Sequence, residues 1–293
     1  MTPPAPRLPP GLSPAMRLRL VRAFRLASRV SPRLAGRLAL ELFLLPARRQ
    51  LDAVDAPVLA RARASRIRLA AHELQVYEWG THADAILLMH GWGSHAPRFG
   101  AFVDPLLAAG FRVLAVDAPA HGKSTGRQAT LELFRAALGA VAGARGPVRG
   151  IVGHSMGASA TVWQMAESPP AEVQAIVLVG MPRDVAFMMD SFAGALELDA
   201  RTRAALVAAF THRYGSPPAA FSAHAVAGRL SMPVLLVHDR ADDVAPFAHA
   251  QALLPVLARG ELVTTDGFAH SGALRDPPTI ARIVDFLVRN SRG

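Results

Sequence analysis

The pentapeptide Gly153-His154-Ser155-Met156-Gly157 constrains the chain more than any other stretch, because it follows an apolar run and precedes small residues. The pattern G-x-S-x-G is typical of a sharp turn between a strand and a helix. Such a turn strains the serine backbone and exposes its Oγ. Gly153 and Gly157 leave room for the turn, and the N–H of Met156 lies at a helix N-terminus, where an oxyanion would develop. The sequence therefore predicts a nucleophile, Ser155.

Strands and helices alternate from residue 66 onward. Strand patterns cover 67–69, 74–79, 85–89, 112–116, 148–152, 175–179, 234–237 and 261–264. Helical patterns cover 96–109, 129–142, 156–167, 246–258 and 278–290. This alternation predicts a mostly parallel sheet covered by helices on both faces.

Residues 181–230 interrupt the alternation with a segment too long for an ordinary connection between two strands. Its helical apolar content predicts an inserted cap over the serine, and a helical pair that fills the sheet edge is the alternative. In a cap, the apolar side chains would face an apolar substrate. The candidate pocket residues are Phe187, Met188, Met189 and Phe192.

The N-terminal 65 residues differ from the rest in charge. The formal net charge is +10, and residues 1–70 hold fourteen arginines against three acidic residues. A Pro-rich tail over 1–14 precedes two expected helices, over 16–30 and from Pro32 through Leu45. We expect both helices to pack on the main domain. Weak attachment of residues 16–50 to an anionic membrane surface is the alternative.

Composition excludes several classes of protein. The 293 residues include no cysteine, so disulfides and thiolate metal sites are absent. No apolar run reaches about eighteen residues, and the start does not resemble a signal peptide, so we expect a cytoplasmic location. No nucleic-acid recognition motif accompanies the arginines, so nucleic-acid binding is not expected.

A serine nucleophile needs a base and an acid that orients the base. His270 follows a glycine turn after the last predicted strand, and it is the expected base. Asp239, Asp242 and Asp243 follow strand 234–237 and compete for the role of the acid. We expect Asp242 to be the acid, with Asp243 as the second choice. The aspartates that are not the acid are expected to be solvated charges on the loop.

The loop after strand 85–89, His90-Gly91-Trp92-Gly93, can present a second backbone donor to an oxyanion. The N–H of Trp92 is the expected donor. We interpret His90 as a hydrogen-bonding residue that holds the loop. His154 lies on the turn next to Ser155, and we expect its ring to point away from that serine.

These stretches together resemble the α/β-hydrolase superfamily, in its serine esterase, lipase and thioesterase branch, over about residues 66–290. The segment Asp117–Ser124 is similar to the family's loop after its fourth strand. The resemblance implies an eight-stranded, mostly parallel sheet, with a core over 66–180 and 231–293. It also implies a cap over 181–230, between strands 6 and 7. The triad would then be Ser155, Asp242 and His270, with no cofactor and no metal.

The expected activity is cleavage of a small carboxylic ester or thioester through an acyl-enzyme intermediate. Acyl transfer, C–C hydrolysis and cofactor-free perhydrolysis use the same triad and stay open, as does a non-catalytic binding protein. A nucleotide-binding P-loop is rejected, because Asp117 stands where its first glycine is needed. Dehalogenases and epoxide hydrolases on this fold carry an aspartate in place of Ser155.

Overall fold

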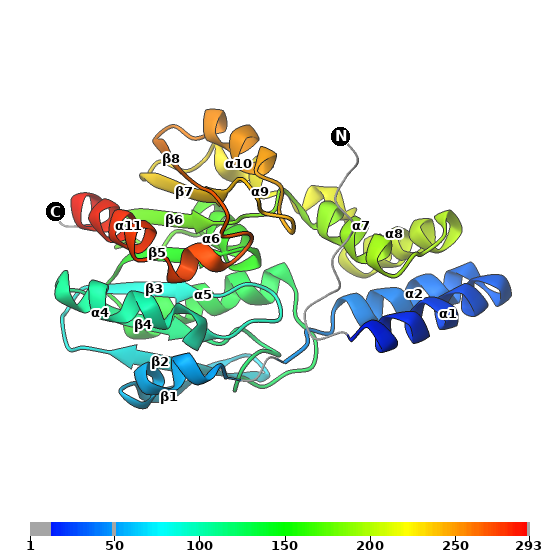
Figure 1. The fold of residues 1–293 in the computed structure, drawn as a ribbon, viewed down its shortest axis with the longest axis horizontal. Coiled ribbons are helices and arrows are strands. Elements are labelled where there is room, and N and C mark those ends of the chain that lie inside the picture. Colours follow the sequence, from blue (N-terminus) through cyan, green and yellow to red (C-terminus); the bar gives the residue numbers. More distant parts are fainter. Residues whose placement is uncertain (1–12, 49–50, 292–293) are drawn as a thin grey trace.

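The computed structural model describes residues 13–48 and 51–291, and its strands form one eight-stranded sheet in the order β1-β2-β4-β3-β5-β6-β7-β8 (Figure 1). The strands are β1 Arg63–Leu69, β2 His72–Trp79, β3 Ala85–Met89, β4 Arg112–Val116, β5 Val148–His154, β6 Ala175–Val179, β7 Val234–Asp239 and β8 Gly260–Thr265. The first two strands are antiparallel to their neighbours and all later pairs are parallel. The predicted sheet is confirmed.

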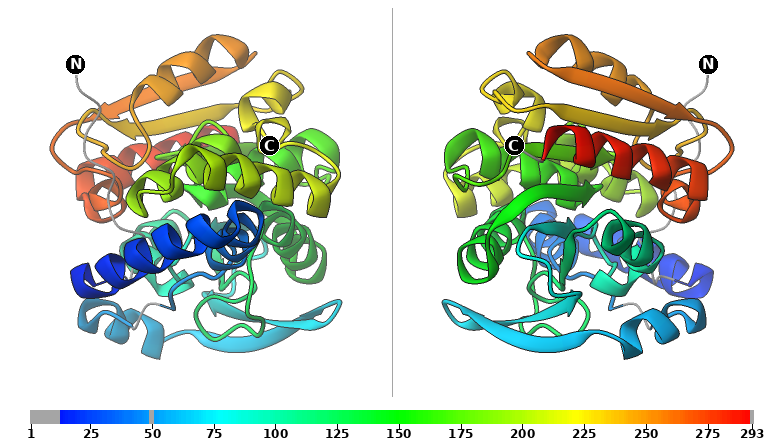
Figure 2. Two further views of the ribbon diagram at one scale, coloured as in Figure 1. Left: turned by 90° about the vertical axis from the view of Figure 1, so that its right-hand side faces the viewer. Right: turned by 90° about the vertical axis from the view of Figure 1, so that its left-hand side faces the viewer.

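Helices cover both faces of the sheet (Figure 2). They are α4 Gly100–Ala108, α5 Leu131–Arg145, α6 Met156–Glu167, α10 Ala248–Leu253 and α11 Pro277–Asn290. Shorter helices are η1 Ala53–Asp55, α3 Ala56–Ala60, η2 Ala96–Phe99, η4 Leu254–Val256 and η5 Gly272–Arg275.

Strand β3 shows why both faces are covered. All five of its residues are apolar and buried, as in strands buried on both faces of a parallel sheet. Successive side chains point to opposite faces. Leu87 and Met89 therefore join the core under α5 and α6, whereas Ile86 and Leu88 join the core under α4 and α11.

The segment between β6 and β7 is helical, with α7 Val185–Ala195, α8 Ala200–Tyr214, η3 Pro218–Ala220 and α9 Ala223–Ala227. Asp184 and Asp199 cap α7 and α8 by accepting bonds from the backbone N–H groups of Phe187 (2.6 Å) and Thr202 (2.9 Å). The helical content of 181–230 agrees with the sequence, whereas its role as a cap stays a prediction.

Two N-terminal helices, α1 Pro14–Val30 and α2 Pro32–Phe43, form a hairpin in which α2 packs on α8 (Figure 1). We call this pair the N-terminal hairpin. Gly36 makes close packing possible, because a Cβ added there would lie 2.5 Å from the carbonyl carbon of Ala205 in α8. Arg17 donates to the carbonyl of Ala195 (2.7 Å) and, with Arg25, pairs with Glu197. The helices were expected to pack on the main domain, and most of this contact is instead with the 181–230 segment.

Candidate active site

Ser155 occupies the turn between β5 and α6 with φ 53° and ψ −121°. Positive φ is costly for a serine, and the surrounding backbone holds it there. A Cβ added at Gly157 would lie 2.4 Å from the carbonyl oxygen of Met89, and one at Gly153 would lie 2.7 Å from Cα of Ala158. Both glycines are therefore required by close backbone contacts, and the strained turn expected from the sequence is present.

Two backbone N–H groups lie beside Ser155 without a hydrogen-bond acceptor among residues 13–48 and 51–291. One belongs to Met156, the first residue of α6, where an N–H has no intrahelical partner. The other belongs to Trp92, in the loop after β3. The adjacent Gly91 lies so close that an added Cβ would be 2.9 Å from Cβ of Ser155. These groups could bind an oxyanion formed at a carbonyl attached to Ser155.

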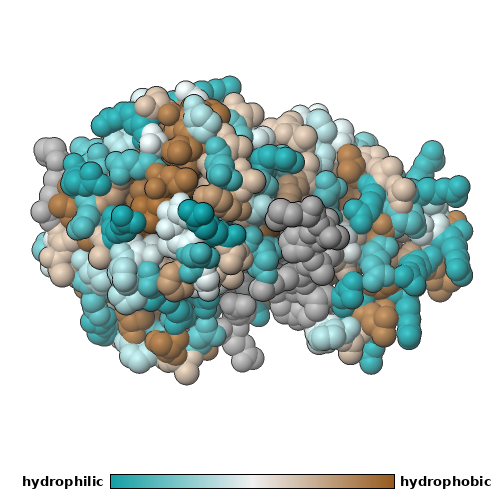
Figure 3. Space-filling view, turned by 45° about the horizontal axis from the view of Figure 1, so that its top comes forward, coloured by the Kyte–Doolittle hydropathy of each residue, from teal (hydrophilic) through white to brown (hydrophobic). Residues whose placement is uncertain are grey.

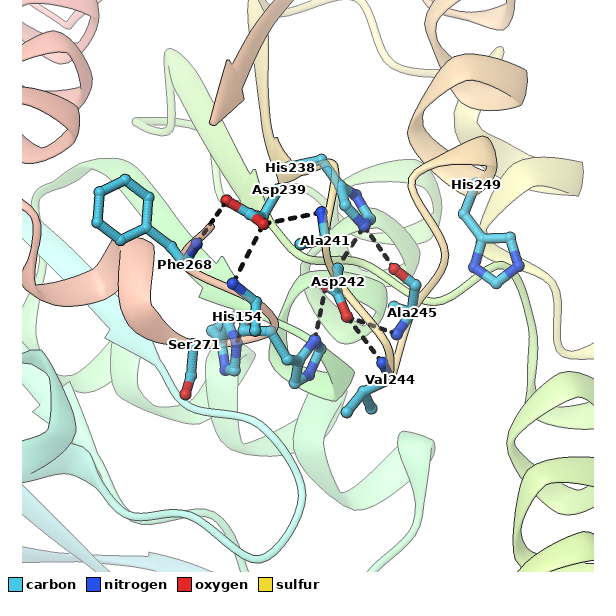
Figure 4. Close-up of polar contacts among 12 residues, drawn as sticks. His154, His238, Asp239, Ala241, Asp242, Val244, Ala245, His249, Phe268 and Ser271 are labelled. Atoms are coloured by element: carbon cyan, nitrogen blue, oxygen red, sulfur yellow. Dashed lines mark hydrogen bonds and ion pairs between the residues drawn. The ribbon is translucent and has the colours of Figure 1, made fainter. Parts of the chain in front are cut away.

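His270 and Asp242 form a hydrogen-bonded pair on the loops after β8 and β7. The Nδ1–Oδ2 distance is 2.9 Å, and the Asp242 side chain is only 1% exposed. The other carboxylate oxygen accepts bonds from the backbone N–H groups of Val244 (2.9 Å) and Ala245 (2.8 Å) (Figure 4). The structure thus brings His270 to Asp242, the first choice among the three candidate acids.

The electrostatics keep Asp242 ionised. Burial raises the pKa of Asp242, but hydrogen bonds from His238 and His270, together with the charge of His270, lower it further than burial raises it. The pKa therefore lies well below its usual range. The carboxylate can then hold His270 in the tautomer with a proton on Nδ1, which leaves Nε2 available as a base.

Asp239 has a role that the sequence reasoning missed. The expectation that Asp239 is a solvated charge on a loop is wrong, because Asp239 is only 3% exposed. Its carboxylate accepts bonds from the backbone N–H groups of Phe268 and Ala269, both at 3.1 Å (Figure 4). It also accepts a bond of 2.7 Å from Oγ1 of Thr265. Asp239 therefore fixes the loop that carries His270. Its position as the last residue of a buried strand was the available signal.

His154 precedes Ser155 in the chain, and its ring contacts the ring of His270, with 4.8 Å between centroids. Its Nε2 is 2.9 Å from the carbonyl oxygen of His270, and burial, with the charge of His270, lowers its pKa to about 3. His154 is therefore neutral and supports the His270 backbone. The Ser155 hydroxyl makes no hydrogen bond to His270 within the described part of the chain, as is common before substrate binds.

Two buried histidines join the loops after β3 and β4. Nε2 of His90 accepts a bond from the N–H of Ala118 (3.0 Å), which agrees with its expected loop-holding role. Nε2 of His121 accepts one from the N–H of Gly93 (2.9 Å), and burial lowers the pKa of His121 to about 4. Both rings accept through Nε2 in their neutral form. They hold the loop that presents Trp92, and His121 was not identified from the sequence.

An apolar cavity lies next to the two free N–H groups. It holds about 400 Å³ of empty space, part of it open to solvent. Its lining residues come from α2, the loops around the site, the start of α5, α6 and the 181–230 segment: Phe43, Leu44, Trp92, Ala129, Thr130, Leu131, Glu132, Met156, Val185, Phe210, Tyr214 and Phe221.

None of the four candidate pocket residues lines this cavity. Met189 and Phe192 are buried in the core, because the face of α7 that carries them after Val185 points inward. Phe187 packs edge-on against His249, with 4.6 Å between ring centroids, and Met188 packs partly buried against the core. Phe192 reaches the cavity only indirectly, through an edge-to-face contact of 5.4 Å with Phe43.

Within 13–48 and 51–291, no group of three or more histidine or acidic side chains is arranged to hold a metal ion.

Comparisons with known proteins agree with this fold. The sequence profile described as the alpha/beta hydrolase family matches residues 86–289. A 2-hydroxy-6-oxononadienedioate/2-hydroxy-6-oxononatrienedioate hydrolase of Pseudomonas putida is 33% identical over 136 residues, which span 43% of this chain and 47% of that relative. The chain thus spans about half the length of this relative.

Two further similarities cover more of the chain. A pimeloyl-[acyl-carrier protein] methyl ester esterase of Aromatoleum aromaticum is 28% identical over 250 residues, which are 70% of this chain and 98% of that protein. The solved structure of the Pyrococcus furiosus esterase Pf2001 matches 85% of this chain and all of its own with a TM-score of 0.65 at 20% identity. The chain therefore belongs to the α/β-hydrolase family of enzymes.

Proposed function

We propose that this protein is a serine hydrolase that cleaves a carboxylic ester or thioester with an apolar acyl group. The observation that carries the proposal is the hydrogen bond from His270 to the buried, ionised Asp242, on loops that meet the strained turn of Ser155. A hydroxyl, an imidazole and a carboxylate on these loops form the set that acyl transfer through serine needs.

The proposed reaction has two halves. Oγ of Ser155 attacks the carbonyl carbon while Nε2 of His270 takes the hydroxyl proton, and the N–H groups of Trp92 and Met156 bind the oxyanion. The tetrahedral intermediate collapses, the C–O or C–S bond breaks, and His270 gives its proton to the leaving alcohol or thiol. Water then attacks the acyl-enzyme with His270 again as base, and the acid and free Ser155 are released.

The cavity favours an ester over C–C cleavage of a dioate, the substrate class in the name of the Pseudomonas relative. Among the residues that the structure describes, no arginine or lysine lines the cavity, and the one charged lining residue is Glu132. A dioate substrate would bury one of its carboxylates in the cavity without a cationic partner, which would be costly. The same triad still allows transfer of the acyl group to an alcohol.

The protein should hydrolyse p-nitrophenyl butyrate, and Ser155→Ala should reduce kcat by about 10⁴-fold or more. Ser159→Ala is the matched control, since Ser159 lies on α6 outside the site and its side chain is only 6% exposed. Full activity in Ser155→Ala would contradict the proposal.

We also propose a weak contact between the outer face of the N-terminal hairpin and an anionic membrane surface. Within the described residues no helix is both long and apolar enough to cross a bilayer, so this contact would be peripheral. Leu26 and Val30 are 64% and 78% exposed. Five exposed arginines occur along the same two helices as these exposed apolar side chains, and none has an ion pair to a described residue: Arg19, Arg22, Arg29, Arg33 and Arg37. In Figure 3 the end of the molecule formed by this hairpin, α7 and α8 mixes hydrophilic and hydrophobic residues.

A further inference from the structure

We propose that the N-terminal hairpin is part of the substrate site, and that Phe43 at the end of α2 limits the length of the acyl chain. This inference rests on the proposed function and goes beyond it, because residues 13–48 lie outside the segment that matches the family. The substrate class is an ester of an uncharged, medium-length acyl chain.

The cavity begins where a bound acyl group would begin. Trp92 and Met156, whose N–H groups lie beside Ser155, are both among its lining residues. A carbonyl oxygen held by these N–H groups places its acyl substituent at this wall. The cavity is therefore in position to receive the acyl chain of an ester bound at the site.

Phe43 is one of the side chains that line this cavity. Its ring stacks on Trp92, with 6.0 Å between centroids and 16° between planes, and it contacts Phe192 edge-to-face. Aromatic rings in such contacts present rigid surfaces with few alternative conformations. Phe43 thus connects the loop of the candidate oxyanion donor to α7.

The chain after Phe43 is fixed to another part of the lining of the same cavity. Leu44 is 2% exposed, and its carbonyl accepts a bond of 2.9 Å from the N–H of Ala129, another lining residue. Four residues later, Arg48 donates to the carbonyls of Gly122, Ser124 and Gly126, at 3.0–3.2 Å. The hairpin end is thereby attached to the loop after β4, so the wall does not depend on α1 and α2 alone.

The hairpin and the 181–230 segment then enclose the cavity together. Val185, Phe210, Tyr214 and Phe221 from that segment face the same space as Phe43 and Leu44. The close contact at Gly36 and the ion pairs to Glu197 hold the two parts together. The cavity is narrow, because the centre of a water-sized sphere can occupy only about 30 Å³ of it. This size favours medium chains, such as butyrate to octanoate, over palmitate.

The test measures kcat/KM on p-nitrophenyl esters from acetate to palmitate for the full chain and two variants. Phe43→Leu enlarges the cavity, and the octanoate-to-butyrate ratio should rise about tenfold. Phe43→Trp reduces the cavity, and the same ratio should fall about tenfold. Leu38→Ala is the control, because Leu38 lies on the same helix but is 49% exposed, and its profile should match the wild type.

The outcomes separate the two proposals. A ratio that is the same in wild type, Phe43→Leu and Phe43→Trp, with an active wild type, would overturn the role of Phe43 and leave the hydrolase proposal standing. A wild type that hydrolyses none of the esters would contradict the proposed function itself. A shift of the ratio in Leu38→Ala equal to that in the Phe43 variants would also overturn the assignment, because Leu38 does not line the cavity.

Discussion

The loops at the carboxyl ends of the strands and the helical unit of α1, α2, α7 and α8 are built by different interactions. In the loops, buried carboxylates and imidazoles bond to backbone N–H groups, as Asp242 does with Val244 and Ala245. In the helical unit, contact is mostly apolar, and its ion pairs to Glu197 are partly exposed. Directional bonds fix atoms closely, whereas apolar contacts tolerate changes of shape. We therefore expect changes in the loops to alter the rate and changes in the helical unit to alter selectivity and stability.

Of the changes that test this comparison of the two regions, Asp242→Asn is expected to have the largest effect. An amide at this position favours the wrong tautomer of His270, and kcat should fall by about 10³- to 10⁴-fold. Steady-state hydrolysis of p-nitrophenyl butyrate measures this loss. Asp243→Asn is the matched control and should lower kcat much less. The reverse result would assign the acid to Asp243 and break the account of the loops.

A second prediction concerns the stability of the loops in acid. His121 has a pKa near 4 in the folded protein and about 6.5 when unfolded, so the unfolded state binds more protons between these values. Its stabilising contribution is complete above about pH 6.5 and is lost as pH falls toward 4. His121→Gln should reduce the acid-induced loss of unfolding free energy by on the order of 2 kcal/mol. Urea unfolding of the wild type and of His121→Gln at pH 7 and pH 4.5 measures this loss of unfolding free energy. An equal loss in the two proteins would contradict the prediction.

Gly36→Ala tests the packing of the helical unit. The added Cβ would meet the backbone of Ala205 at 2.5 Å, so α2 must move away from α8, at a cost of about 1–3 kcal/mol. Gly143→Ala is the control, because a Cβ there meets nothing within 4 Å, and better helix propensity should stabilise α5 by up to about 1 kcal/mol. Thermal unfolding should show opposite shifts of Tm. A raised Tm in Gly36→Ala would show that the hairpin does not pack on α8 as described.

The smallest effect is expected at the outer face of the N-terminal hairpin. The protein should sediment weakly with vesicles that contain anionic lipid and not with neutral ones, and about 0.5 M salt should release it, because exposed charges are screened. Arg29→Glu with Arg33→Glu should weaken binding several-fold. Equal binding to neutral vesicles, or none to anionic ones, would contradict the contact.

The same difference between regions explains what could be predicted from the sequence. The strands, the turn at Ser155 and the loop histidine His270 follow local patterns, and they lie where the sequence indicates. The role of Asp239 depends on N–H groups at Phe268 and Ala269, 29 and 30 positions away, so its position at the end of a buried strand indicates burial but not these partners.

The helical unit was less predictable because its contacts are long-range. Helical periodicity identifies the apolar stripe of α7, but it does not tell whether the stripe faces a core or a cavity. Met189 and Phe192 therefore lie in the core, whereas Phe43, from a segment far away in the sequence, lines the cavity. Likewise the apolar stripes of α1 and α2 do not specify whether they pack on the main domain or on α8.

The central claim is that Ser155 is a nucleophile activated by His270. The most direct measurement is labelling of the folded protein with a fluorophosphonate probe, followed by mass spectrometry of the modified peptide. The account predicts one stoichiometric label on Ser155, greatly slowed in Asp242→Asn and absent in Ser155→Ala. Labelling that persists in Ser155→Ala, or no labelling of the folded wild type, would contradict it.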